Sequence, residues 1–242
     1  MSVASLDLHS EITIAAVAAA SPATIRVFQR HGIDFCCGGK RPLADVCSEK
    51  GLDFASLAQE LRAAAEERNG EPDWTRARFN TLIAHILVTY HEALRDELPR
   101  LLMMADKVAR VHGEQHPETR EVRRVLAGFV PELERHMIVE EDEVFPRILQ
   151  IERDPAGRSA DQAALGDRLA ALEREHETAG SELAELRALT TDYTPPAGAC
   201  NTYRGLYWGL GELERTMHRH VHLENNILFP RALALHRGAA QG

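Results

Sequence analysis

Beyond residue 80 the sequence contains four segments in which apolar residues recur at alternating steps of four and three. These segments are Ile83–Leu98, Val122–Val144, Leu165–Leu186 and Leu206–Ile227. A mean step of about 3.5 residues keeps one apolar seam of each helix turned toward its neighbours in a bundle. The spacing therefore predicts an all-α fold whose main part is a four-helix bundle.

Each of the four seams is interrupted by side chains of the kind that bind metals. They are His91 on the first seam, His136 with Glu140 on the second, His176 on the third, and His220 with Glu224 on the fourth. An unpaired charge or imidazole is costly to bury, so a packed seam should be apolar. Residues four apart share a helix face. Six ligand-type groups thus converge on one core, which predicts a metal cluster.

The sequence also repeats itself. The segments beginning at His136 and His220 both follow the pattern H-x3-E-x4-F-P-R, and a weaker match joins the surroundings of His91 and His176. The bundle is therefore predicted to consist of two helical hairpins, each supplying one lone histidine and one His/Glu pair. A doubled half-site indicates two metal ions rather than one.

The ligand types favour iron. If both glutamates bridge, each metal ion has two imidazoles, and an oxo or hydroxo bridge completes five ligands and leaves one position open. Mixed imidazole and carboxylate ligation suits iron better than manganese or zinc. Structural zinc prefers four ligands, often thiolates, and no cysteine falls on these seams.

Other polar residues of the bundle have simpler interpretations. A single histidine on a helix face is more often a packed core residue than a ligand, and only the repeated set argues otherwise. His218 and His222 are expected to be solvated, because they point away from His220. The acidic run Glu141–Glu143 is predicted to be a solvated face. Glu92 and Glu177 either orient histidines or lie on the surface.

The chain divides near residue 70. Residues 1–70 are predicted to form a small helical domain, with helical patterns at Ile12–Ala20, Pro22–Arg30 and Asp53–Glu67, and Asn69–Pro72 is a predicted linker. Residues 71–242 hold the bundle, in which Pro99 and Pro131 should kink or restart their helices. A loop is expected between the third and fourth bundle helices, at residues 192–201.

Charge and hydropathy exclude several classes of protein. The formal net charge is −9, which argues against nucleic acid or an anionic membrane as partner, because both require a basic face. No apolar run approaches the roughly 20 residues that cross a bilayer, and the N-terminus lacks the features of a signal peptide. These features predict a cytoplasmic protein.

The adjacent cysteines Cys36 and Cys37, followed by two glycines, lie in a predicted loop. Three interpretations remain open from the residues alone: reactive thiols, transient metal or nitrosyl ligands, and small buried residues. Nearby basic side chains would favour the first two. Cys47 and Cys200 are expected to be buried and inert. Four cysteines with this spacing do not resemble a secreted disulfide framework.

The Asp-Phe-Cys-Cys-Gly-Gly-Lys segment at 34–40, followed by His-Leu-Glu-Asn-Asn-Ile-Leu-Phe-Pro-Arg-Ala at 222–232, resembles the iron–sulfur cluster repair di-iron protein family, which is hemerythrin-like. The resemblance covers essentially the whole chain. It implies a non-haem di-iron centre with four histidines and two bridging glutamates, at the same six positions that the seams single out. It also implies a part in function for Cys36 and Cys37, as a thiol relay.

The resemblance implies a cytoplasmic protein of the nitrosative and oxidative stress response that helps damaged iron–sulfur proteins recover, most simply by donating iron. A first alternative is binding of nitric oxide and its reduction to nitrous oxide, an enzymatic activity at the same centre. A second alternative is O2 binding or sensing, against which the cysteine-bearing domain and the lack of a fifth histidine argue. A homodimer through the N-terminal part would be compatible with these functions.

Overall fold

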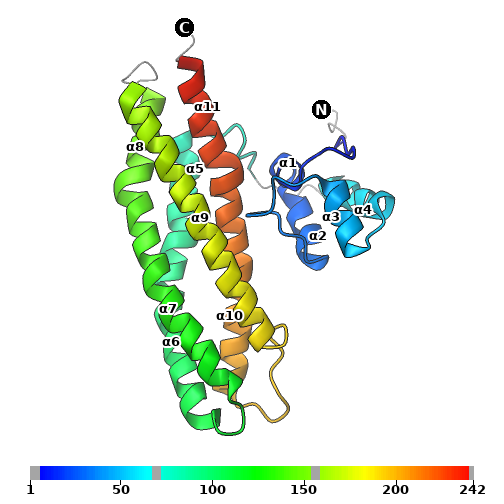
Figure 1. The fold of residues 1–242 in the computed structure, drawn as a ribbon, viewed down its shortest axis with the longest axis vertical. Coiled ribbons are helices and arrows are strands. Elements are labelled where there is room, and N and C mark those ends of the chain that lie inside the picture. The colour runs from blue at the N-terminus through cyan, green and yellow to red at the C-terminus, as the bar shows by residue number, and fades with distance from the viewer. Residues whose placement is uncertain (1–5, 67–71, 154–158, 240–242) are drawn as a thin grey trace.

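The computed structural model describes residues 6–66, 72–153 and 159–239, which form a long helical bundle with a small helical domain at its side (Figure 1). Within these ranges the only β-type pairing is an isolated bridge between Thr13 and Pro42. None of the described helices is long and apolar enough to cross a membrane.

The bundle consists of four long helical segments, which we call legs. Three of them contain a π turn, a wider helical turn with one extra residue. The legs are α5 (Phe79–Ile86), η2 (Leu87–His91) and α6 (Glu92–His112); α7 (Glu118–Val139), η3 (Glu140–Val144) and α8 (Phe145–Arg153); α9 (Ser159–Leu189); and α10 (Asn201–Leu223), η4 (Glu224–Leu228) and α11 (Phe229–Ala239). The predicted loop between the last two legs is confirmed. Pro99 and Pro131 do not restart their helices, because α6 and α7 continue through them.

The apolar core of the bundle is divided into two clusters. One runs through the lower part of the bundle and includes Leu94, Leu133 and Val221, and the other fills the upper end and includes Ile86 and Leu172. The six polar residues singled out by the seams lie along the chain where one cluster gives way to the other. The bundle therefore encloses a polar layer between two apolar layers.

The small N-terminal domain packs beside the α10–α11 leg (Figure 1). Its elements are α1 (Ile14–Ala20), η1 (Pro22–Thr24), α2 (Ile25–Arg30), α3 (Leu43–Lys50) and α4 (Phe54–Glu66). Three of these regions match the predicted helical patterns, whereas α3 was missed, although Pro42 before it and a left-handed Gly51 after it mark its ends. The predicted linker Asn69–Pro72 lies outside the described residues except for Pro72.

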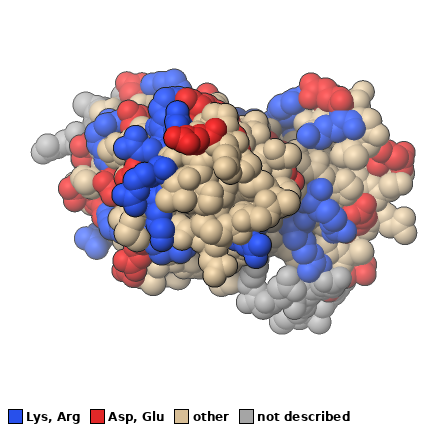
Figure 2. Space-filling model, turned by 90° about the horizontal axis from the view of Figure 1, so that it is seen from below, with Lys and Arg blue, Asp and Glu red and all other residues tan. Residues whose placement is uncertain are grey.

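Seen from below, the molecule has basic and acidic side chains mixed at both sides of the view and a wide uncharged area between them (Figure 2). Exposed ion pairs among the described residues include Arg41 with Glu49 and Arg124 with Glu185. Pairs of this kind add little stability, so the apolar clusters and the helical hydrogen bonds hold the fold together.

Candidate metal centre

The structure brings all six polar seam residues into one buried layer. Each is between 0% and 5% exposed. They form two groups, and the glutamates belong to both: His91 and His220 with Glu140 and Glu224, and His136 and His176 with the same two glutamates. Within each group the candidate ligand atoms lie within 4.8 Å of one another. The arrangement can hold a metal ion in each group.

The two carboxylates lie between the two groups of histidines. Glu140 Oε2 is 3.4 Å from His91 Nε2, and Glu140 Oε1 is 3.4 Å from His136 Nε2. Glu224 Oε1 is 2.9 Å from His220 Nε2, and Glu224 Oε2 is 3.3 Å from His176 Nε2. Each glutamate therefore directs one oxygen toward each group, as a bridging carboxylate must.

In three of the four imidazole rings, the nitrogen that faces away from the centre, Nδ1, is hydrogen-bonded to an acceptor. The Nδ1 atoms of His91, His136 and His176 lie 2.7 Å from Glu141 Oε1, 2.7 Å from Glu175 Oε2 and 2.8 Å from Asn225 Oδ1. Since these partners are acceptors, each Nδ1 carries the hydrogen and donates it, as metal-binding histidines do. In the neutral form that binds a metal, each of these rings turns the lone pair of its Nε2 toward the centre.

The centre consequently has many acceptors and too few hydrogens. The Nε2 atoms of His91 and His220 are 3.1 Å apart, and those of His136 and His176 are 2.8 Å apart. Among the described residues, both oxygens of Glu140 and Oε2 of Glu224 are buried without a hydrogen-bond partner. Buried charges of this kind need compensation. The donor set fits cations held among the six side chains.

The pKa values of the groups in this layer also reflect the need for positive charge beside the two carboxylates. Burial and the charge of Glu140 raise the pKa of Glu224 to about 8. Burial alone would lower the pKa of His136. The charge and hydrogen bond of Glu140, the hydrogen bond of Glu175 and the charge of Glu224 together outweigh burial and raise it to about 9. When no metal ion neutralises the two carboxylates, protons on these groups do so instead.

The π turns bring in residues that the sequence pattern did not select. Glu140 and Glu224 each begin a π turn, and the next residues, Glu141 and Asn225, turn inward to meet a histidine. The expectation that Glu141 is merely a solvated face is wrong. Glu92 and Glu177, which were candidates for orienting histidines, are exposed, and the structure gives that contact to Glu141 and Glu175.

Two further expectations also need correction. His222 is not solvated but 1% exposed, because the N-terminal domain covers the outer face of α10 and places Phe35 against its ring. His218 is half-buried and also contacts Phe35.

Cys47 is buried as predicted, whereas Cys200 is exposed at the N-cap of α10, with its Sγ 3.3 Å from His112 Nε2.

The cysteine loop, residues 34–40, lies against the bundle near His176. The Asp34 Oδ1 atom accepts hydrogen bonds from the main-chain N–H groups of Cys36 and Cys37, which fixes the turn. Cys37 Sγ lies 3.7 Å from the main-chain oxygen of His176. The neighbouring Cys37 thiol and burial raise the pKa of the Cys36 thiol, whereas Cys37 is half-exposed. Cys37 is therefore the more accessible of the two sulfurs.

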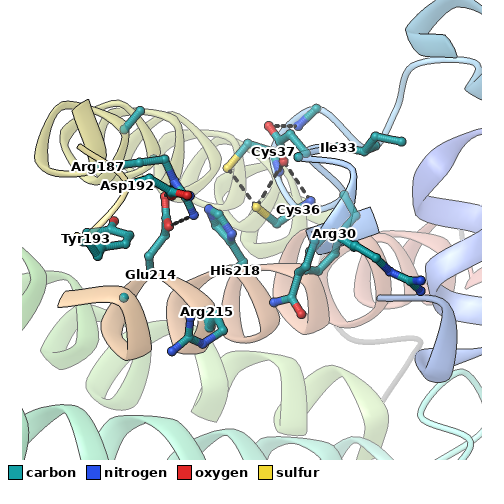
Figure 3. Close-up of a pocket in the computed structure, with 18 of the residues that line it drawn as sticks. Arg30, Ile33, Cys36, Cys37, Arg187, Asp192, Tyr193, Glu214, Arg215 and His218 are labelled. Carbon is teal, nitrogen blue, oxygen red and sulfur yellow. Dashed lines mark hydrogen bonds and ion pairs between the residues drawn. The ribbon is translucent and has the colours of Figure 1, made fainter. Parts of the chain in front are cut away.

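Both cysteines line a cleft of about 1120 Å³ between the N-terminal domain and helices α9 and α10. His218 lies between their sulfurs on one side and the Arg187–Glu214 ion pair on the other (Figure 3). Asp34, Cys36 and Cys37 form a third group of candidate ligand atoms within 4.8 Å of one another. The thiols thus face a solvent-filled space large enough for part of another molecule.

Comparison with known proteins gives two matches that together cover most of the chain. Residues 82–232 match the family of the hemerythrin HHE cation binding domain, and residues 10–65 match ScdA_N, a domain of unknown function. Proteins named iron–sulfur cluster repair protein YtfE, from Yersinia pseudotuberculosis and Yersinia pestis, are 39% identical over 221 residues. The alignments cover 91% of this chain and 96% of each relative. The predicted all-α, hemerythrin-like fold and the family resemblance are confirmed.

Proposed function

This chain belongs to the hemerythrin-domain family of iron–sulfur cluster repair proteins, and we propose that it repairs clusters damaged by nitrosative or oxidative stress by donating iron. The observation that carries the proposal is the buried layer of His and Glu acceptors with the cysteine loop seated directly beside it. Its partners are then damaged iron–sulfur proteins, and its place is the cytoplasm.

The proposed centre holds two iron ions, one for each group of histidines. His91 and His220 would hold one ion, His136 and His176 the other, and Glu140 and Glu224 would be shared. Imidazole and carboxylate ligands together suit ferrous and ferric iron. The converging lone pairs and the unpartnered carboxylate oxygens support this assignment.

Iron that is donated is cargo, so the residues must release it as well as bind it. As an ion leaves, His136 and Glu224 take up protons, because their pKa values of about 9 and about 8 favour the protonated forms at neutral pH. Protonation of the ligands makes release less costly. Cys36 and Cys37 would act as a relay, since their sulfurs lie between the bundle and the open cleft and thiolates are good ligands for iron in transit.

Binding of nitric oxide and its reduction to nitrous oxide is the second candidate. A cavity of about 110 Å³ is lined by His136 and His176 themselves, which gives a diatomic molecule a way to the centre. Two adjacent ferrous ions would supply the two electrons that convert two nitric oxide molecules and two protons into nitrous oxide and water. O2 binding would use the same cavity but gives the cysteine loop no role.

An anaerobic transfer assay separates these functions. The iron-loaded protein is mixed with an apo-ferredoxin and a sulfide source, and cluster formation is followed by its visible absorbance. The proposal predicts fast transfer that is lost in the Cys36→Ala/Cys37→Ala variant and kept in Cys200→Ala, whose thiol lies at the exposed N-cap of α10. No transfer, together with stoichiometric nitrous oxide after addition of nitric oxide, would favour the second candidate.

A further inference from the structure

The side chain of Asn226 joins the cysteine loop to the bundle. Its Nδ2 atom donates to the main-chain oxygens of Phe35 and Cys36, at 3.0 Å and 3.2 Å. The same atom lies 3.1 Å from Nδ1 of the buried His222. The amide nitrogen has two hydrogens for these three neighbours: one is shared by the two carbonyl oxygens of the loop, and the other is directed to His222, so Asn226 contacts the loop and α10 at once. The loop is therefore held by a specific polar contact as well as by packing.

Asn226 is the third residue of the π turn η4, directly after two residues that belong to the metal centre. Glu224, the first residue, is a proposed ligand, and Asn225, the second, accepts the hydrogen of His176 Nδ1. Three consecutive residues thus face a metal site, a ligand histidine and the cysteine loop. Because they share adjoining peptide units, a shift of the turn at one of them must move the others.

The loop is closely packed around Gly39, where it meets itself, α1 and this turn. A Cβ atom on Gly39 would lie 2.7 Å from the main-chain oxygen of Phe35, 2.9 Å from the Ala15 side chain and 3.3 Å from Asn226 Oδ1. Helix α1 packs on the same π turn. The bound position of the loop consequently tolerates little displacement of η4.

We propose that Asn226 is a positioning residue that couples docking of the cysteine loop to the geometry of His176 and Glu224. The loop docks when η4 has the shape that binds metal, and it loosens when the metal leaves, which exposes Cys36 and Cys37 to an acceptor protein. The inference rests on the proposed iron-donating function and specifies its regulation. Coupling between two such sites is reciprocal: metal binding strengthens docking by the same factor as docking strengthens metal binding.

The first half of the bundle offers a matched control. Asp142 occupies the position in η3 that corresponds to Asn226 in η4, two residues after the proposed ligand Glu140. Asp142 is exposed, whereas Asn226 is half-buried against the N-terminal domain. Replacing either residue by alanine shortens a side chain at the same place in a π turn, but only Asn226→Ala removes a contact with the loop.

The test is the rate at which iodoacetamide alkylates each cysteine of the full chain, measured by mass spectrometry with and without bound ferrous iron. In the unchanged protein, iron should slow alkylation of Cys36 and Cys37 about fivefold or more, the lower range of measured couplings. Asp142→Ala should behave identically. In Asn226→Ala both cysteines should react fast whether or not iron is bound. The exposed Cys200 serves as an internal reference whose rate stays constant.

A second variant acts from the opposite side of the contact. In Gly39→Ala the added Cβ atom clashes with the main-chain oxygen of Phe35 in the loop itself and with Ala15 of α1, and it also crowds Asn226 Oδ1. This displaces the loop without replacing a residue of the bundle, and it should also abolish the protection by iron. Protection that persists in Asn226→Ala and Gly39→Ala would overturn the coupling, since iron would then shield the thiols directly. Measuring bound iron in each variant distinguishes this failure from failure of the proposed function. If the unchanged chain binds no iron, the proposed function fails. If it binds iron and iron protects the thiols equally in all variants, only the coupling fails.

Discussion

The two halves of the bundle carry the same proposed ligands but surround them differently. In the first half, the lone histidine His91 donates to a carboxylate, Glu141; in the second, His176 donates to a neutral amide, Asn225. His136 has Glu175 behind it, whereas His220 Nδ1 has no partner among the described residues and its ring lies parallel to Tyr90 instead. The duplication has kept the ligand set and changed what supports it.

The difference indicates that the two halves support their histidines unequally. Each proposed metal site takes one histidine from each half, so each has one histidine with a carboxylate at its Nδ1 and one without. A carboxylate behind an imidazole fixes the ring and raises its basicity. Both histidines of the first half have this support, and neither histidine of the second half has it. The hydrogen bonds from Asn226 to the cysteine loop and the packing of α1 on η4 also lie in the second half. The half that holds its ligands less firmly is thus the half beside the cysteine loop, where a donated ion would leave.

The shared carboxylates should give the largest effect. Glu140→Leu and Glu224→Leu should each weaken iron binding more than about 100-fold, beyond the range for residues that only support a ligand, because each glutamate faces both groups of histidines. Iron per chain after anaerobic desalting measures this. Asp142→Asn, on the exposed side of the same turn, is the control and should keep its iron.

The pH dependence should come second, and each half contributes a proton to it. Without metal, His136 and Glu224 are protonated at pH 7, because their pKa values are raised to about 9 and about 8. Both must lose their protons to become ligands, so iron affinity rises with pH up to these values, about tenfold per pH unit for each proton. A pH-indicator dye should report proton release when ferrous iron is added at pH 7. Constant affinity between pH 6 and 8 would exclude this assignment of protons.

Substitutions of the acceptors at histidine Nδ1 should affect iron binding differently in the two halves. Glu141→Ala should weaken iron binding by about 10- to 100-fold, whereas Asn225→Ala should cost less, because a neutral amide polarises an imidazole less than a carboxylate does. Competition with a chelator of known affinity measures both. Glu143→Ala, which alters an exposed partner of Arg168, should leave the affinity unchanged. Equal losses for Glu141→Ala and Asn225→Ala would show that charge behind the histidine is irrelevant.

The smallest effect is expected at the edge of the domain contact. Lys40 Nζ forms a 2.8 Å ion pair with Glu173, and the Lys40 side chain is 69% exposed. Exposed pairs contribute less than about 1 kcal/mol. Lys40→Ala should therefore change the free energy of unfolding by less than that and leave thiol alkylation near the unchanged rate, in contrast to Asn226→Ala. Chemical denaturation and the alkylation assay together measure the difference.

The sequence was sufficient to predict the four-helix core and to select the six residues, because histidine and glutamate on an apolar seam stand out against a strict spacing. It did not reveal Glu141 and Asn225. A regular helix turns about 100° per residue, which directs the neighbour of a seam residue away from the core, and only the π turn brings it back. His222 was misjudged for a different reason: the outer face of α10 is covered by the N-terminal domain, and the pattern of one helix contains no information about such a contact.

The most direct test of the account is an anaerobic titration of metal-free protein with ferrous iron, followed by equilibrium dialysis and near-infrared circular dichroism. Two groups of ligand atoms that share both glutamates predict two bound ions per chain. Binding that saturates at a single ion, or two ions retained in full by Glu224→Leu, would contradict a centre built from two half-sites.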